Sequence, residues 1–94
     1  MDLTSVAIAN PVVVLREEFD DWAVLYNPDT AQAVGLSPTA VAVWKLIDGR
    51  RDVQGIIAGA TAGYSGVPET AGDEVLELLD GFLRDGFVGL PDAG

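Results

Sequence analysis

Cysteine and histidine are both missing from this chain of 94 residues. Without cysteine there are no disulfides and no thiolate nucleophile, and without histidine there is no side chain that commonly serves as a general base near neutral pH. Zinc sites built from Cys and His are excluded for the same reason. These absences fit a protein that is not an enzyme, and we expect no catalytic residue, no metal site and no cofactor.

Basic residues are also scarce, because 5 Lys and Arg stand against 15 Asp and Glu, giving a formal net charge of −10. Affinity for nucleic acid comes largely from Lys and Arg that neutralise phosphates, so this surface argues against nucleic acid. It argues against an anionic membrane in the same way. A neutral or basic polypeptide is the more compatible partner, although acidity that only keeps the domain in solution explains the charge equally well.

Long apolar runs are absent as well. No segment approaches the roughly 20 apolar residues of a membrane helix, and residues 1–10 lack the basic flank of a signal peptide. We therefore expect a cytoplasmic protein. The length, with 49% hydrophobic residues, is typical of one folded domain over residues 1–94, in which residues 1–10 are a weakly patterned lead-in segment.

Three segments in the first half of the chain predict strands, at residues 12–19, 22–28 and 30–36. Asn27-Pro28-Asp29 has the composition of a tight turn. Strands joined by such short connections favour an antiparallel meander.

After residue 36 the spacing of apolar residues becomes that of a helix. Ser37 is a suitable N-cap with Pro38 at the first helical position, and Gly49 is expected to end this first helix. Asp52 is expected to cap a second helix, and a third runs from about Glu69 to Asp85. Three strands followed by three helices predict an α+β fold.

The third helix carries more apolar surface than a core-facing helix needs. Its apolar residues cover about 160° of the circumference, against roughly 100° for an ordinary amphipathic helix. Val75, Leu79, Phe82 and Gly86 form one line, with Leu76 and Leu83 to one side and Leu78 to the other. Either the helix packs against two internal partners, or part of this stripe lies in a surface groove.

The third predicted strand, Thr30 to Leu36, lacks the Lys and Pro residues that usually protect a sheet edge. At the edge of the meander, its unpaired backbone groups would be open to another strand. An open edge beside an apolar helix stripe is the arrangement that binds a peptide as an additional strand.

The ordered set of these features resembles the PqqD-like family, which includes the pyrroloquinoline quinone biosynthesis protein D and is also known as the precursor-peptide recognition element. The resemblance covers residues 11–90. Its landmarks are Leu36, Trp44, Asp48-Gly49, Val53, Ile56 and the line from Val75 to Gly86. Residues 10–30 look closest to the SynChlorMet cassette branch, whose members accompany radical S-adenosylmethionine (SAM) proteins.

The resemblance implies a winged helix-turn-helix-like domain that binds the leader of a ribosomally made precursor peptide (a RiPP precursor) and presents it to a radical SAM maturase. The domain itself would be a monomer or a weak homodimer. In the family, the leader adds beside the third strand and rests against the third helix. Carried over, the strand positions are Thr30, Ala31, Gln32, Ala33, Val34, Gly35 and Leu36, and the helix positions are Leu76, Leu79, Asp80 and Leu83.

Other functions remain open at this point. An open strand edge can pair with a second copy, which would make the domain a structural or dimerisation module. A DNA-binding winged helix needs a basic recognition helix, yet no Lys or Arg occurs between Val53 and Leu83. An enzyme built on Glu17-Glu18 or Asp20-Asp21 is disfavoured because adjacent strand side chains point to opposite faces. Gly81, inside the third helix, is either a tolerated weak position or a place where another backbone passes closely.

Overall fold

The computed structural model describes residues 2–18, 22–62 and 70–90. Within these ranges the elements are β1 (Ile8–Ala9), β2 (Val14–Glu17), β3 (Ala23–Asn27), β4 (Gln32–Leu36), α1 (Pro38–Lys45), α2 (Val53–Thr61), α3 (Ala71–Arg84) and β5 (Val88–Gly89). The α+β, winged helix-turn-helix-like class with a three-stranded antiparallel sheet before three helices is confirmed. The predicted helix start at Glu69 and the carboxylates of Asp20 and Asp21 lie outside the described residues.

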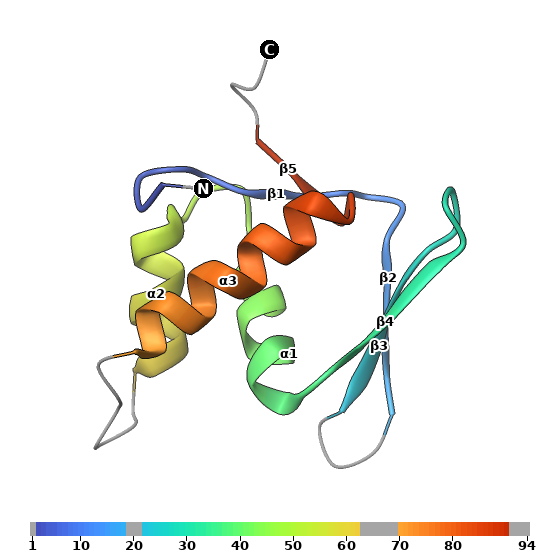
Figure 1. The fold of residues 1–94 in the computed structure, drawn as a ribbon, viewed down its shortest axis with the longest axis horizontal. Coiled ribbons are helices and arrows are strands. Elements are labelled where there is room, and N and C mark those ends of the chain that lie inside the picture. Colours follow the sequence, from blue (N-terminus) through green and yellow to red (C-terminus); the bar gives the residue numbers. More distant parts are fainter. Residues whose placement is uncertain (1, 19–21, 63–69, 91–94) are drawn as a thin grey trace.

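The strands β2, β3 and β4 form an antiparallel sheet in that order, so β4 lies at an edge as predicted. Side chains alternate across the sheet. Ala23 and Leu25 of β3 and Leu36 of β4 are buried, whereas Val14 and Tyr26 on the other face are exposed. Figure 1 shows this sheet beside the three helices, at the right of the view.

Residues 1–10, expected to be a lead-in segment, take part in the fold. Their strand β1 pairs antiparallel with β5, which follows α3 (Figure 1). Ala7 is completely buried, and the carbonyl oxygen of Ser5 accepts a hydrogen bond from the N–H of Val53 at 2.9 Å. The segment therefore covers part of the core, which its sequence pattern does not predict because only two residues form the strand.

The helix α1 begins as predicted. Ser37 caps it by accepting a hydrogen bond from the N–H of Ala40 at 3.3 Å, and Pro38 occupies the first position. It ends at Lys45, earlier than the predicted stop at Gly49. Gly49 does have a positive φ of 77°, but it lies in the turn between α1 and α2, where it redirects the chain.

The core lies where the helices meet β3 and β5. Its largest fully buried side chains are those of Leu25, Val43, Val53, Ile56, Leu79 and Phe87. The ring of Phe82 on α3 packs edge-on against Trp44 of α1, with centroids 5.5 Å apart, and against Phe87, with centroids 6.5 Å apart. These aromatic contacts hold α3 at a defined position relative to α1, and hence to β4, which leads into α1.

Candidate functional site

The pairing pattern of the sheet determines which backbone groups of β4 are open. Next to the β2–β3 hairpin, the N–H of Glu18 donates to the carbonyl oxygen of Trp22 at 2.8 Å, so these residues form a hydrogen-bonded pair in the antiparallel register. Backbone groups alternate in direction along a strand. Trp22 and every second residue after it therefore direct their backbone groups towards β2, and the alternate residues, beginning with Ala23, direct theirs towards β4.

The partners of those alternate residues on β4 are Gln32, Val34 and Leu36, whose backbone groups are used within the sheet. The N–H and C=O groups of Ala33 and Gly35 consequently point away from β3, towards the open edge. No strand in the described part of the chain lies beside them. The edge thus offers two donors and two acceptors to an additional strand.

Only five of the seven residues carried over for the strand lie in β4. Thr30 and Ala31 lie in the hairpin turn, where the N–H of Gln32 donates to Oγ1 of Thr30 at 3.3 Å. Ala31 has a φ of 60°, a left-handed conformation that costs an alanine about 1–2 kcal/mol and does not continue a strand. The predicted strand begins two residues too early for this reason.

A surface groove of about 650 Å³ lies between β4 and α3. It is lined by Val34, Gly35, Leu36, Ser37, Thr39 and Ala40 on one side, by Glu74, Glu77, Leu78, Gly81, Phe82, Arg84 and Asp85 on the other, and by Trp22. Its floor is apolar, because Leu36, Ala40 and Phe82 are at most 4% exposed. An extended segment paired with β4 can place its side chains in this groove.

The groove meets α3 on the flank of Leu78. None of the four α3 residues carried over from the family lines it. Leu79 is 0% exposed and belongs to the core, while Leu76, Asp80 and Leu83 are half-buried on other sides of the helix. The sequence left two explanations for the wide apolar stripe, namely internal packing and a surface groove. Both apply, because most of the stripe packs inside the protein and the Leu78 flank borders the groove.

Sequence reasoning did not identify Trp22, Leu78 or Phe82 as groove residues. The alternation along β3 correctly separates Trp22 from the core-facing residues, and its side chain is 54% exposed. A large exposed aromatic next to an edge strand is the signal that could have located it, because Trp is enriched at binding surfaces. Phe82 could be predicted only as a core residue, since its second role depends on where the floor of the groove lies.

Four charged side chains line the groove, namely the carboxylates of Glu74, Glu77 and Asp85 and the guanidinium of Arg84. Nε of Arg84 lies 4.0 Å from Oδ1 of Asp85. In the described ranges, no basic side chain comes within 4.0 Å of either glutamate. The groove therefore combines an apolar floor with an acidic wall on α3.

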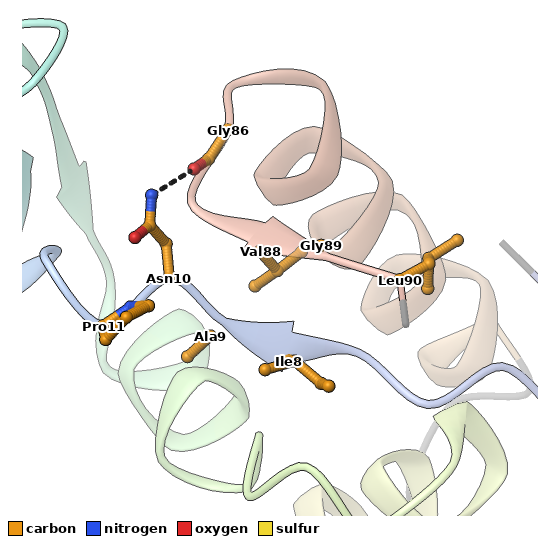
Figure 2. A pocket seen from close by; sticks show the side chains of 8 residues that line it. All are labelled: Ile8, Ala9, Asn10, Pro11, Gly86, Val88, Gly89 and Leu90. Atoms are coloured by element: carbon orange, nitrogen blue, oxygen red, sulfur yellow. Dashed lines mark hydrogen bonds between the residues drawn. The ribbon is translucent and has the colours of Figure 1, made fainter. Parts of the chain in front are cut away.

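A second, smaller hollow of about 340 Å³ lies where β1 meets β5 (Figure 2). It is lined by Ile8, Ala9, Asn10, Pro11, Gly86, Val88, Gly89 and Leu90, none of which has a titratable side chain. Figure 2 shows the Asn10 amide directed at Gly86, and its Nδ2 donates to that carbonyl oxygen at 3.3 Å. The polar group of this hollow thus joins the two strands.

The carboxylates of Glu17, in β2, and of Glu18, directly after it, lie in surface ion pairs. Nζ of Lys45 lies 2.6 Å from Oε1 of Glu17, and Nε of Arg16 lies 4.0 Å from Oε1 of Glu18. Within residues 2–18, 22–62 and 70–90, no three His, Cys, Asp or Glu side chains are grouped so that they could hold a metal ion. None of the helices in the same ranges has the length and apolar content of a membrane span.

Comparison with known proteins relates the chain to one family and one structure. The family described as coenzyme PQQ synthesis protein D (PqqD) matches residues 23–88, which is more than half of the chain. The solved structure of TbiB1 in complex with the TbiA(beta) leader peptide is similar in fold, with a TM-score of 0.71 and 21% sequence identity. The match covers 93% of this chain and 98% of TbiB1. A search of curated proteins by sequence finds no match.

Proposed function

Because the chain belongs to the PqqD family, we propose that it is a non-catalytic, cytoplasmic chaperone for a ribosomally synthesised precursor peptide. It binds the leader of that peptide and presents the remaining segment to a radical SAM maturase. The observation that carries the proposal is the open edge of β4 beside an apolar groove. The similar fold of TbiB1, a protein bound to a leader peptide, supports it.

The leader binds as a fourth strand of the sheet. Its backbone pairs with the outward N–H and C=O groups of Ala33 and Gly35, and alternate side chains enter the groove towards Leu78 and Phe82. No residue of the domain needs to perform chemistry. Holding the leader raises the effective concentration of the peptide at the maturase, so the second encounter is almost intramolecular.

The test is a titration of the isotopically labelled domain with the leader of a precursor peptide encoded beside its gene, followed by backbone amide shifts. We expect the largest shifts at Ala33, Gly35 and the groove-lining residues of α3. Shifts confined to the hollow between β1 and β5, or no shifts with any neighbouring leader, would contradict strand addition at β4.

Two proline variants separate the open edge from the sheet itself. In Gly35→Pro the lost N–H points outward, so we expect a fold close to that of the wild type and at least a tenfold loss of leader affinity. In Val34→Pro the lost N–H belongs to the β3–β4 ladder, so we expect the free energy of unfolding to fall by about 1–3 kcal/mol. Calorimetric titration and urea unfolding of both variants measure the two effects. Full leader affinity in a folded Gly35→Pro variant would rule out this geometry.

The open edge equally permits the alternative of a dimerisation module, in which β4 pairs with β4 of a second copy. Light scattering across a concentration series tests the alternative, because a mass that rises with concentration supports the dimerisation module and a mass fixed at one chain rules it out. No observation favours DNA binding, since α2 carries no Lys or Arg and α3 carries only Arg84, at its end.

A further inference from the structure

We infer that the segment which adds to β4 is cationic, with apolar side chains on the floor of the groove and Lys or Arg side chains that reach Glu74 and Glu77. This inference rests on the proposed function, because it states the chemistry of the peptide bound at the same site. It concerns this chain's own side chains on α3.

The charge balance of the groove favours a cationic segment. Three carboxylates and one guanidinium line it, which leaves a net charge of −2 (three negative charges minus one positive). Arg84 lies next to Asp85 at the C-terminal end of α3, so the excess negative charge is that of Glu74 and Glu77. An anionic or acidic segment in the groove would place like charges together, which disfavours binding.

The positions of Glu74 and Glu77 on the helix also favour a bound cation. Glu74 lies in the first turn of α3, where the helix dipole favours a carboxylate in any case. Glu77 lies beyond that turn, where the dipole gives little stabilisation. The two residues are three apart, so they share a face and repel each other. A cation between them removes this repulsion.

Apolar surface next to the carboxylates suits the long side chains of Lys and Arg. Leu78 follows Glu77 directly, lies one turn after Glu74 and lines the same groove. Lys and Arg lay their aliphatic stems along apolar surface while the charged group remains at the edge. The face of the exposed Trp22 is a further favourable neighbour for a cation. The net charge of −10 also accelerates the approach of a basic peptide.

The test uses a display library of random linear peptides of about a dozen residues, selected on three immobilised proteins. These are the wild type, the double variant Glu74→Gln/Glu77→Gln, and the matched control Asp29→Asn/Asp73→Asn. Each double variant removes two negative charges. Asp73 is exposed in the first turn of α3, and neither control position lines the groove. We expect Lys and Arg to be enriched on the wild type and the control, but not on the groove variant.

Affinities of individual selected peptides follow from calorimetric titration of each of the three proteins. We expect roughly two- to fivefold weaker binding for each glutamate neutralised, the size typical of exposed ion pairs. A peptide with its Lys or Arg replaced by Gln should lose the same factor on the wild type and nothing on the groove variant.

The possible results distinguish a failure of the cationic assignment from a failure of the proposed function. Some selected peptides bind at the edge of β4, as judged by their weaker affinity for Gly35→Pro. If these peptides are not enriched in Lys or Arg, the cationic assignment is wrong and the proposed function remains in place. Equal enrichment of Lys and Arg on the groove variant and on the control would mean that the preference comes from overall charge. This result would also overturn the cationic assignment. Failure to select any peptide that depends on Gly35 would contradict both.

Discussion

At Gly81, a larger side chain would stabilise helix α3 but would narrow the groove. It lies inside α3 and lines the groove, and an added methyl group would meet only Nη2 of Arg84, at 3.7 Å. Gly costs about 1 kcal/mol relative to Ala in a helix interior. Of the two interpretations open from the sequence, the groove position supports close approach by another backbone.

Gly81→Ala should therefore stabilise the domain by up to about 1 kcal/mol and at the same time weaken leader binding, because the methyl group occupies groove space. Gly72→Ala is the matched control. It lies on the same helix outside the groove, where an added Cβ would be 3.7 Å from Cδ1 of Ile57. Urea unfolding and calorimetric titration measure both variants, and unchanged affinity in Gly81→Ala would contradict the close approach.

Ala31 sets where the open strand β4 begins, because its left-handed φ of 60° does not continue a strand. Ala31→Gly relieves that conformation, but glycine also loses more entropy on folding. We expect a net gain of about 0.5–1 kcal/mol in the free energy of unfolding, measured by urea titration. Ala33→Gly, in the extended strand, is the control and should be destabilising. A loss of stability in Ala31→Gly would show that the turn does not hold this conformation.

At the scale of elements, the turn between α1 and α2 is organised by Asp48. Its Oδ1 accepts hydrogen bonds from the N–H groups of Arg50 and Arg51, both at 2.9 Å, and Oδ2 lies 2.8 Å from Nη1 of Arg51. The backbone N–H of Arg51 is the main cause that holds the pKa of the Asp48 carboxyl below its ordinary value, followed by the N–H of Arg50. The charged form of Asp48 is thus favoured in the folded protein.

This lowered pKa predicts the pH dependence of an Asp48→Asn variant. A carboxyl with a lower pKa in the folded state adds stability above its unfolded pKa of about 3.9, and this contribution disappears as the pH falls through the folded value. The wild type should be more stable than Asp48→Asn at pH 7, and the difference should shrink below about pH 4. Urea midpoints of both proteins at several pH values test this. A difference that is constant down to pH 2 would assign it to hydrogen-bond geometry alone.

At the scale of the whole molecule, the chain is flat, with extents of 39 × 37 × 18 Å. The sheet lies beside the helices, so β4 and α3 border the same surface groove (Figure 1). A net charge of −10 on a molecule of this size repels itself and opposes the compact state. The same charge disfavours the close pairing of two copies.

Added salt should consequently stabilise the free domain and weaken the complex. Raising NaCl from about 0.01 M to 0.15 M shortens the screening length from about 30 Å to about 8 Å. We expect the unfolding temperature to rise by a few degrees, and the affinity for a basic peptide to fall over the same range. Thermal unfolding followed by circular dichroism and calorimetric titration measure the two trends. A lower unfolding temperature in salt would mean that favourable ion pairs outweigh the repulsion.

Much of the fold could be predicted because it depends on local chemistry. Ser37 and Asp52 cap their helices through hydrogen bonds within three residues, and alternation along β3 separates buried from exposed side chains. The start of β4 was misplaced because Ala31 gives no sign of its positive φ. The β1–β5 pair was not foreseen because its partners are about 80 residues apart.

The sequence by itself determined the order of the three-stranded sheet and the three helices, the open character of the third predicted strand and the absence of Cys and His chemistry, since each depends on residue type or short-range spacing. Only the tertiary structure decided that the N–H of Gly35 points outward, that the Leu78 flank of α3 lines the groove, and that Glu74 and Glu77 border it. These properties depend on the pairing of distant segments and on the rotation of α3. Contacts such as that between Phe82 and Trp44 set that rotation.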